Sequence, residues 1–190
     1  MKLKIYREAI VIILLGIMLI SCDKPNKRVG LSDDGNKYSN DIIKNIENYN
    51  EIGKNGYKNI YVGSKFDSNF LKKNTEIVDE CFNAIEKNGD EDTYYQIERG
   101  VVSLIYTSDI NVKSYTGVKI GDRLEDVYSK HNNETAAVLD NPYGEPKKNI
   151  IVTYWYSPKK DMGIRYDVDD GLVSGISIGD SSLVFLEGCL

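Results

Sequence analysis

Residues 95–109 read YQIERGVVSLIYTSD, and residues 166–180 read YDVDDGLVSGISIGD. The segments align without gaps, and their identical pairs are Tyr95/Tyr166, Gly100/Gly171, Val102/Val173, Ser103/Ser174, Ile105/Ile176 and Asp109/Asp180. In each segment a glycine separates two runs rich in β-branched and aromatic residues, which predicts a β-hairpin. The similarity is either an internal repeat or chance, because any hairpin favours glycine in the turn and β-branched residues after it.

A second pair of segments favours the repeat. Gly63-Ser-Lys-Phe66 precedes one helical pattern, and Gly117-Val-Lys-Ile120 precedes another. The first pattern has the spacing of one helix face and consists of Ile77, Val78, Cys81, Phe82 and Ile85. The second consists of Leu124, Val127 and Tyr128, with Asp122 as the expected cap and Glu125 at the reciprocal position. Because two separate segments agree in their order, we predict a true repeat.

The predicted fold class is α+β. Two fused strand-helix-hairpin units, residues 57–112 and 113–190, make up one globular domain at residues 57–190. The second unit carries an additional strand at residues 150–156, followed by a loop. We expect the helices to pack on one face of an antiparallel sheet.

Residues 117–127, GVKIGDRLEDV, resemble the pattern G-[IV]-x-x-G-x-[ST]-x-x-[DE]-V of BamE-like (SmpA/OmlA) lipoproteins. The same pattern occurs in β-lactamase-inhibitor-like tandem domains and in uncharacterised bacterial lipoproteins. Arg123 stands where these families have Ser or Thr, and Lys130-His-Asn132 replaces their Leu-Gly-x-Pro. The resemblance covers about 60 residues per unit. It implies a BamE-like tandem whose sheet or loops bind another protein, and not an enzyme.

Residues 1–21 have the pattern of an export signal. Lys2, Lys4 and Arg7 precede an apolar run at residues 9–20. As a helix this run would span roughly 18 Å, too short for a hydrocarbon core of about 30 Å. Leu19-Ile-Ser-Cys22 then matches a lipobox, which predicts cleavage before Cys22 and acylation of its thiol. The alternative is a plain signal peptide with an incidental cysteine.

Acyl chains on Cys22 would anchor the protein in the cell membrane or the outer membrane, facing outside the cytoplasm. Residues 22–56 are mostly polar and predict a flexible tether, with a short helix allowed around Ile42, Ile43, Ile46 and Tyr49. The whole chain has a formal charge of −5, of which the signal contributes +2, so the chain from Cys22 onward carries −7. This balance argues against nucleic acid as a partner, because nucleic-acid surfaces need clustered Lys and Arg.

The sequence predicts no cofactor and no metal site. His131 is the only histidine, and no Ser-His-Asp or Cys-His arrangement forms around it. Because His131 ends the second predicted helix, we expect it to stabilise the helix dipole as a cation and not to catalyse. Cys81 and Cys189 remain once Cys22 is acylated, and the sequence leaves open whether they form a disulfide or stay reduced.

Trp155 is the candidate binding residue. Strand alternation places Trp155 and Thr153 on one face and brings Arg165 and Asp167 of the next strand beside them. An exposed tryptophan beside arginine has the composition of an interface anchor. The alternative is that a loop or the other unit covers this face.

We therefore expect a membrane-anchored bacterial lipoprotein whose non-catalytic domain binds an envelope protein. The first alternative is a module that binds a soluble ligand or the cell wall. A hydrolase with an unrecognised site is less favoured, because no catalytic motif is present.

Overall fold

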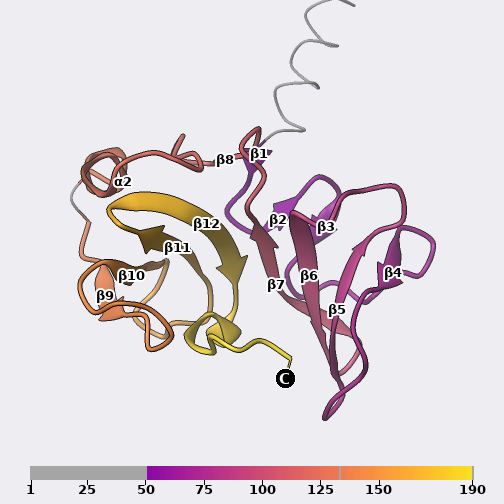
Figure 1. The fold of residues 1–190 in the computed structure, drawn as a ribbon. Helices are drawn as coiled ribbons and strands as arrows, with labels where there is room; N and C mark the ends of the chain where they lie inside the picture. Colours follow the sequence, from indigo (N-terminus) through magenta and orange to yellow (C-terminus); the bar gives the residue numbers. More distant parts are fainter. Residues whose placement is uncertain (1–50, 133, 190) are drawn as a thin grey trace, which may run out of the picture.

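Two antiparallel β-meanders of the same design form one eight-stranded sheet (Figure 1). The structure, a computed structural model, describes residues 51–132 and 134–189. The first meander consists of β4 (Leu71–Lys73), β5 (Cys81–Glu86), β6 (Thr93–Glu98) and β7 (Val101–Thr107). The second consists of β9 (Ala137–Asp140), β10 (Asn149–Trp155), β11 (Gly163–Asp169) and β12 (Leu172–Gly179). Because β7 pairs with β12, the strand order is β4-β5-β6-β7-β12-β11-β10-β9.

A smaller sheet connects the start of the described chain with the link between the meanders. Its strands are, in order, β3 (Ile60–Tyr61), β2 (Gly56–Tyr57), β1 (Glu51–Ile52) and β8 (Lys113–Ser114). Ile52 is fully buried, so the fold already includes the last residues of the segment expected to be a tether. Cys22 and the earlier tether residues lie outside the described residues. Within the described part of the chain, no helix has the length and apolar character needed to cross a membrane.

The two hairpins have the same turn. Arg99 and Gly100 both have positive φ, at 50° and 77°, and Asp170 and Gly171 have φ of 49° and 82°. Two successive positive φ angles define a type I′ turn, whose twist matches that of the flanking strands. Glycine in the second position makes this backbone easy to adopt.

The hairpins also share an irregularity. The strand register shifts after Gln96 in β6 and after Asp167 in β11, which are aligned positions. Where β7 meets β12, Tyr106 lies opposite Ser177, which is its own aligned position. An approximate two-fold axis through this pair therefore relates the two meanders.

In the segments that lead into the two hairpins, the structurally equivalent residues are not those that the sequence alignment paired. The Gly63 N–H donates to the Val102 carbonyl at 2.8 Å, and the Gly121 N–H donates to the Val173 carbonyl at 2.7 Å. Val102 and Val173 are aligned, so the equivalent of Gly63 is Gly121. The sequence alignment, which matched Gly63 with Gly117, was displaced by four residues.

The predicted α+β class and the BamE-like architecture are wrong. The units are β-meanders, and the described residues contain a single α-helix, α2 (Leu124–Lys130). Of the apolar residues expected to form the first helix, Cys81, Phe82 and Ile85 lie in β5, and Ile77 and Val78 precede it. Val78 and Cys81 bridge across a two-residue turn in which Asp79 and Glu80 have φ of 47° and 64°, and this turn starts a new hairpin. The apolar spacing around Cys81 was therefore misread as a helical period.

One face of the large sheet forms the core. Tyr95, Ile105, Ile164, Tyr166 and Ile176 are fully buried on it. Their cross-strand pairing places them on the same side, because each pairs with another core residue of the neighbouring strand. α2 covers the second meander's part of this face through Val127, which is also fully buried.

Asp122 does not cap α2 as expected. The N-cap position is Arg123, whose N–H donates to the Asp126 carboxylate at 3.2 Å. The Asp122 carboxylate instead accepts hydrogen bonds from the Lys119 N–H at 2.9 Å and from the Lys130 ammonium group at 2.5 Å. Asp122 thus ties the last turn of α2 to the loop before it.

Candidate functional site

The face predicted to be open for binding is covered. Thr153 and Arg165 are only 7% and 5% exposed, and Trp155 and Asp167 are partly buried. The 3₁₀ helix η1 (Ser181–Val184) lies over this side of the sheet, and the Arg165 guanidinium donates to the Leu183 carbonyl at 3.0 Å. Arg165 Nε also lies 3.2 Å from Asp167 Oδ1, in an ion pair. Of the two alternatives left open by the sequence, the covered face is the one observed, and an exposed Arg165 beside Trp155 is excluded.

The C-terminal segment is held in this position by a covalent bond. Cys81 and Cys189 form a disulfide, with their Cα atoms 5.2 Å apart. The bond joins β5 of the first meander to the residues that follow η1. The Ser182 hydroxyl adds a hydrogen bond to the Ser103 carbonyl at 3.2 Å.

His131 follows α2, where the sequence placed it, but its surroundings differ from the expectation. Its side chain is 1% exposed, and its ring stacks on Tyr154 with centroids 3.7 Å apart. Burial lowers the pKa of His131, and Glu134, with Oε2 3.9 Å from Nδ1, only partly opposes this effect. His131 is therefore neutral near pH 7 and cannot act as the expected cation at the helix end.

A buried chain of hydroxyl groups begins at His131. Nε2 lies 2.8 Å from the Tyr166 hydroxyl, which lies 3.2 Å from both Ser114 Oγ and Thr116 Oγ1. The Val118 N–H donates to Ser114 Oγ at 3.0 Å. Burial raises the pKa of Tyr166, so its hydroxyl stays protonated. The network fastens the loop after β8 and the end of α2 to the sheet.

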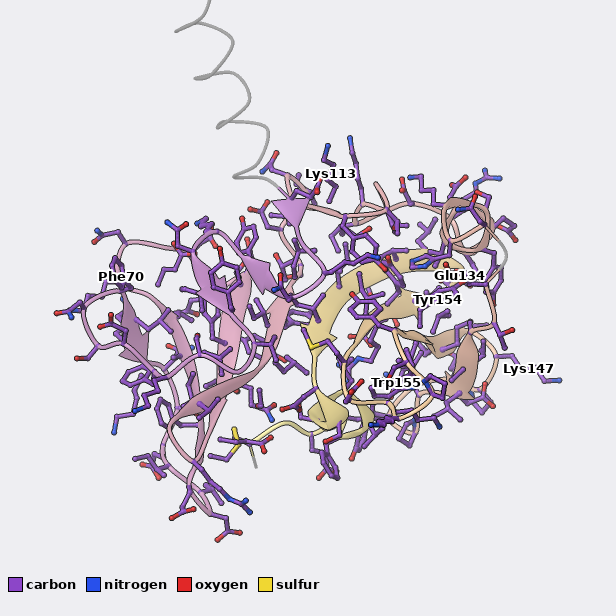
Figure 2. The ribbon with its side chains drawn as sticks, turned by 180° about the vertical axis from the view of Figure 1, so that it is seen from behind. Phe70, Lys113, Glu134, Lys147, Tyr154 and Trp155 are labelled. Carbon is purple, nitrogen blue, oxygen red and sulfur yellow. A yellow bond between two sulfur atoms is a disulfide. The ribbon has the colours of Figure 1, made fainter. Side chains whose placement is uncertain are left out.

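An open pocket of about 620 Å³ lies on the outer side of this network. We call it the tyrosine pocket, and it is lined by Lys54, Tyr115, Thr116, Lys130, His131, Asn132, Glu134, Thr135, Tyr154, Trp155 and Tyr156. Figure 2 shows Glu134 close to Tyr154, at the end of the second meander where the pocket lies. A shallower hollow of about 400 Å³ adjoins it and shares Thr135, Trp155 and Tyr156.

Aromatic rings form one wall of the tyrosine pocket. The rings of Tyr115 and Tyr156 meet edge to face, with centroids 5.9 Å apart. The Lys54 ammonium group lies over both rings, 5.2 Å from the centroid of Tyr115 and 5.8 Å from that of Tyr156. This wall therefore offers flat apolar faces, and the long cationic side chain of Lys54 lies above them.

The tyrosine pocket contains polar atoms without partners. Tyr154 is 2% exposed, and its hydroxyl has no hydrogen-bond partner among the described residues. The Tyr156 hydroxyl is also buried. Burial and the nearby Tyr115 raise the pKa of Tyr156. Burial, together with Tyr128 and Glu134, raises the pKa of Tyr154 to about 12, so this hydroxyl keeps its proton. An unpaired buried hydroxyl costs about 1–3 kcal/mol of stability.

The first meander supplies an internal comparison. Ala84 pairs with Tyr95 as Val152 pairs with Tyr166, so Glu86 occupies the position of Tyr154. Glu86 also lines a pocket, of about 340 Å³, but its carboxylate accepts hydrogen bonds at 2.9 Å from both Lys58 and the Tyr95 hydroxyl. The polar groups at this position are thus paired in the first meander and unpaired in the second.

Sequence reasoning missed most of the tyrosine pocket. The cluster Tyr154-Trp155-Tyr156 and the total of fourteen tyrosines were visible signals. Tyr115 and Lys54 reach the pocket only because β1 pairs with β8, which is a contact between distant segments. No local pattern in the sequence predicts that pairing.

The chain matches no family model. It also matches no curated protein sequence. Among solved structures it is similar to the uncharacterized protein yfeY from Escherichia coli, with 16% sequence identity and a TM-score of 0.47. The match covers 68% of this chain and 99% of that chain. A similarity at this level assigns neither a family nor a function.

Proposed function

We propose that this chain is a membrane-anchored lipoprotein of the cell envelope with a non-catalytic binding domain, and that the tyrosine pocket is its binding site. The proposal is carried by Tyr154, which lines the pocket and whose protonated hydroxyl is buried without a hydrogen-bond partner among the described residues. A ligand that displaces the side chains covering this hydroxyl and bonds it recovers the free energy lost by burying it unpaired. In the first meander the residue at the equivalent position, Glu86, has its polar group paired.

The absence of catalysis in this proposal is supported by the state of His131. Its side chain is almost fully buried, and Nε2 already interacts with the buried Tyr166 hydroxyl. Lys130, the nearest lysine in the chain, is held by Asp122 and by the Gly117 carbonyl at 2.8 Å. A general base must reach the proton that it removes from a substrate, and neither group is free to do so.

The proposed anchor rests on the lipobox at residues 19–22. An acylated Cys22 would hold the domain on a bilayer, facing outside the cytoplasm, where the Cys81–Cys189 disulfide is chemically permitted. Envelope components are then the molecules that the tyrosine pocket meets.

The binding role can be tested with the protein's own fluorescence. Trp155 is the only tryptophan and lines the pocket, so its emission reports ligand binding. The full-length protein in detergent is titrated with glycan, peptide and lipid fractions of bacterial envelopes. We expect a saturable change with at least one fraction, which Tyr154→Phe weakens and Tyr143→Phe, at an exposed tyrosine outside the pocket, leaves unchanged. Emission that no fraction changes would refute the proposal.

A second candidate function, capture of a protein partner, is favoured by the outer edge of β9. All four residues of β9 are exposed, including Val138 at 47% and Leu139 at 65%. In the first meander, edge strand β4 carries Lys73 at the position of Val138 and Lys72 at that of Ala137, and lysines on an edge oppose strand addition. An apolar edge without such charges suits β-strand addition by an extended segment of a partner.

A further inference from the structure

We propose that the tyrosine pocket binds an oligosaccharide, a claim that rests on the ligand-binding role proposed above and names its ligand class. A sugar ring has faces of C–H groups and a rim of hydroxyls. A complementary site therefore needs flat aromatic surfaces, neutral hydrogen-bonding groups and little net charge.

The aromatic wall meets the first requirement. Tyr115 and Tyr156 are inclined by 77°, so they present two differently oriented faces. Polarised C–H groups are attracted to the negative face of an aromatic ring, as the Lys54 ammonium group already is at 5.2 Å. A sugar ring can pack where the flexible Lys54 side chain now lies.

The polar groups of the pocket meet the second requirement. The Tyr154 hydroxyl has no hydrogen-bond partner among the described residues, and the Tyr156 hydroxyl lies beside that of Tyr115. Thr116, Asn132 and Thr135 add further neutral groups that line the same space. Hydroxyl and amide groups both donate and accept, which is what recognition of sugar hydroxyls requires.

The charges of the pocket meet the third requirement. Lys130 is neutralised by Asp122, and the other two charged residues, Lys54 and Glu134, have opposite signs. A phosphate or a strongly cationic ligand would find no excess of opposite charge here. A separate hollow of about 230 Å³ in the first meander differs, because Glu86, Asp90 and Asp109 line it.

The size of the site indicates more than one sugar unit. The tyrosine pocket and the adjoining hollow measure about 620 Å³ and 400 Å³, and Trp155 and Tyr156 belong to both. A chain of rings can therefore continue past these two side chains. We expect an oligosaccharide to bind more tightly than its monomer.

The test measures Trp155 emission of the full-length protein in detergent with four probes: the trimer of N-acetylglucosamine, its monomer, maltotriose and inorganic phosphate. We expect saturable binding of at least one trisaccharide. If the trimer of N-acetylglucosamine binds, its monomer should bind at least tenfold more weakly. Phosphate should not bind. Tyr154→Phe should weaken trisaccharide binding about tenfold, as loss of one hydrogen bond does. Tyr143→Phe should leave it unchanged.

Lys54→Ala separates a sugar from an anionic ligand. A sugar should bind this variant as well as or better than the wild type, because the variant frees the aromatic faces. An anion should lose most of its affinity. If neither trisaccharide binds, but a peptide or lipid fraction changes Trp155 emission in a Tyr154-dependent manner, the oligosaccharide is wrong and the binding role stands. If no probe and no fraction changes it, both proposals fail.

Discussion

At the scale of single residues, the buried hydroxyl of Tyr154 should lower the stability of the free protein, and under the proposed function it would also contribute to binding. Its hydroxyl is buried without a partner among the described residues, whereas the equivalent group, the Glu86 carboxylate, has two. Removing an unpaired buried hydroxyl relieves its desolvation cost without opening a cavity. A residue that weakens the free protein in this way is typical of a binding site.

Tyr154→Phe should therefore raise the free energy of unfolding by about 1 kcal/mol. The matched change Tyr166→Phe should lower it by about 1–3 kcal/mol, because it leaves His131 and Ser114 without their shared partner. Urea unfolding of both variants measures the difference. A Tyr154→Phe protein that is less stable than the wild type would mean that this hydroxyl has a partner.

His131 should make stability depend on pH. Its folded pKa is lowered, chiefly by burial, so the unfolded chain takes up a proton first as the pH falls below about 6.5. Stability is fully present above that value and should fall by up to about 1.4 kcal/mol per pH unit until the pH reaches the folded pKa. Urea midpoints at pH 7.5 and 5.5 measure the loss, and His131→Gln should reduce it. If His131→Gln loses as much stability between pH 7.5 and 5.5 as the wild type, other titrating groups cause the pH dependence.

Residue-level predictions from the sequence failed where contacts over long distances decide the environment. The position of His131 at the end of a helix was readable, but its neutral state follows from stacking on Tyr154, which no helical pattern reveals. Arg165 was expected to be exposed because strand alternation separates faces without saying which face is covered. Here η1 covers that face.

At the scale of elements, local turn chemistry made the hairpins predictable. Gly100 and Gly171 each follow a residue with positive φ in a type I′ turn, and both turns lie where the sequence placed them. α2 was also recognisable, because Leu124, Val127 and Tyr128 recur at helical spacing over its seven residues. β5 was not, because a short apolar run fits either period when its turn is formed by Asp79 and Glu80 instead of glycine.

The two outer edges of the large sheet should differ in what they bind. A photo-crosslinking amino acid at Leu139, on the apolar β9 edge, should capture an envelope protein in intact cells. The same substitution at Asn74, the corresponding exposed position beside β4, should capture none. Val138→Lys should abolish the capture and change stability by less than about 0.5 kcal/mol, because the side chain is exposed. Equal capture from Leu139 and Asn74 would show that the β9 edge is not a specific binding site.

At the scale of the whole molecule, the disulfide should contribute much of the stability. Cys81 and Cys189 are 108 residues apart, and in the chain-entropy model a loop of this length contributes about 4–5 kcal/mol. The double variant Cys81→Ala, Cys189→Ala should lose a similar amount in urea unfolding, and reductant should affect only the wild type. A loss below about 1 kcal/mol would show that η1 stays in place without the bond.

Anchoring is the second property of the whole molecule that can be measured. Cys22→Ala should prevent acylation, so the variant should either keep its signal or leave the detergent phase during phase separation. The wild type should partition into detergent. A variant that loses residues 1–21 and still partitions like the wild type would contradict the lipobox.

The overall architecture could not be read from the sequence. The resemblance of residues 117–127 to BamE-like proteins describes a loop and a short helix, and such a segment can precede a β-meander as well as a helix-covered sheet. Pairing of β7 with β12 and of β1 with β8 decides the fold, and both join segments far apart in the chain. The internal repeat was the sequence feature that came nearest to this arrangement, because the paired strands β7 and β12 are its two copies.

The disulfide also has a consequence for the order of folding, because its two cysteines lie far apart in the chain. If the chain is exported as proposed, starting from its N-terminal side, Cys81 emerges 108 residues ahead of Cys189. Throughout that interval the first meander carries a free thiol at Cys81, and the edge of β7 that pairs with β12 is still unpaired. The β12 strand of another copy fits this edge equally well, which is the starting point for strand exchange between chains. Formation of the Cys81–Cys189 bond within one chain ends the interval, so we expect an early bond to disfavour strand exchange between chains.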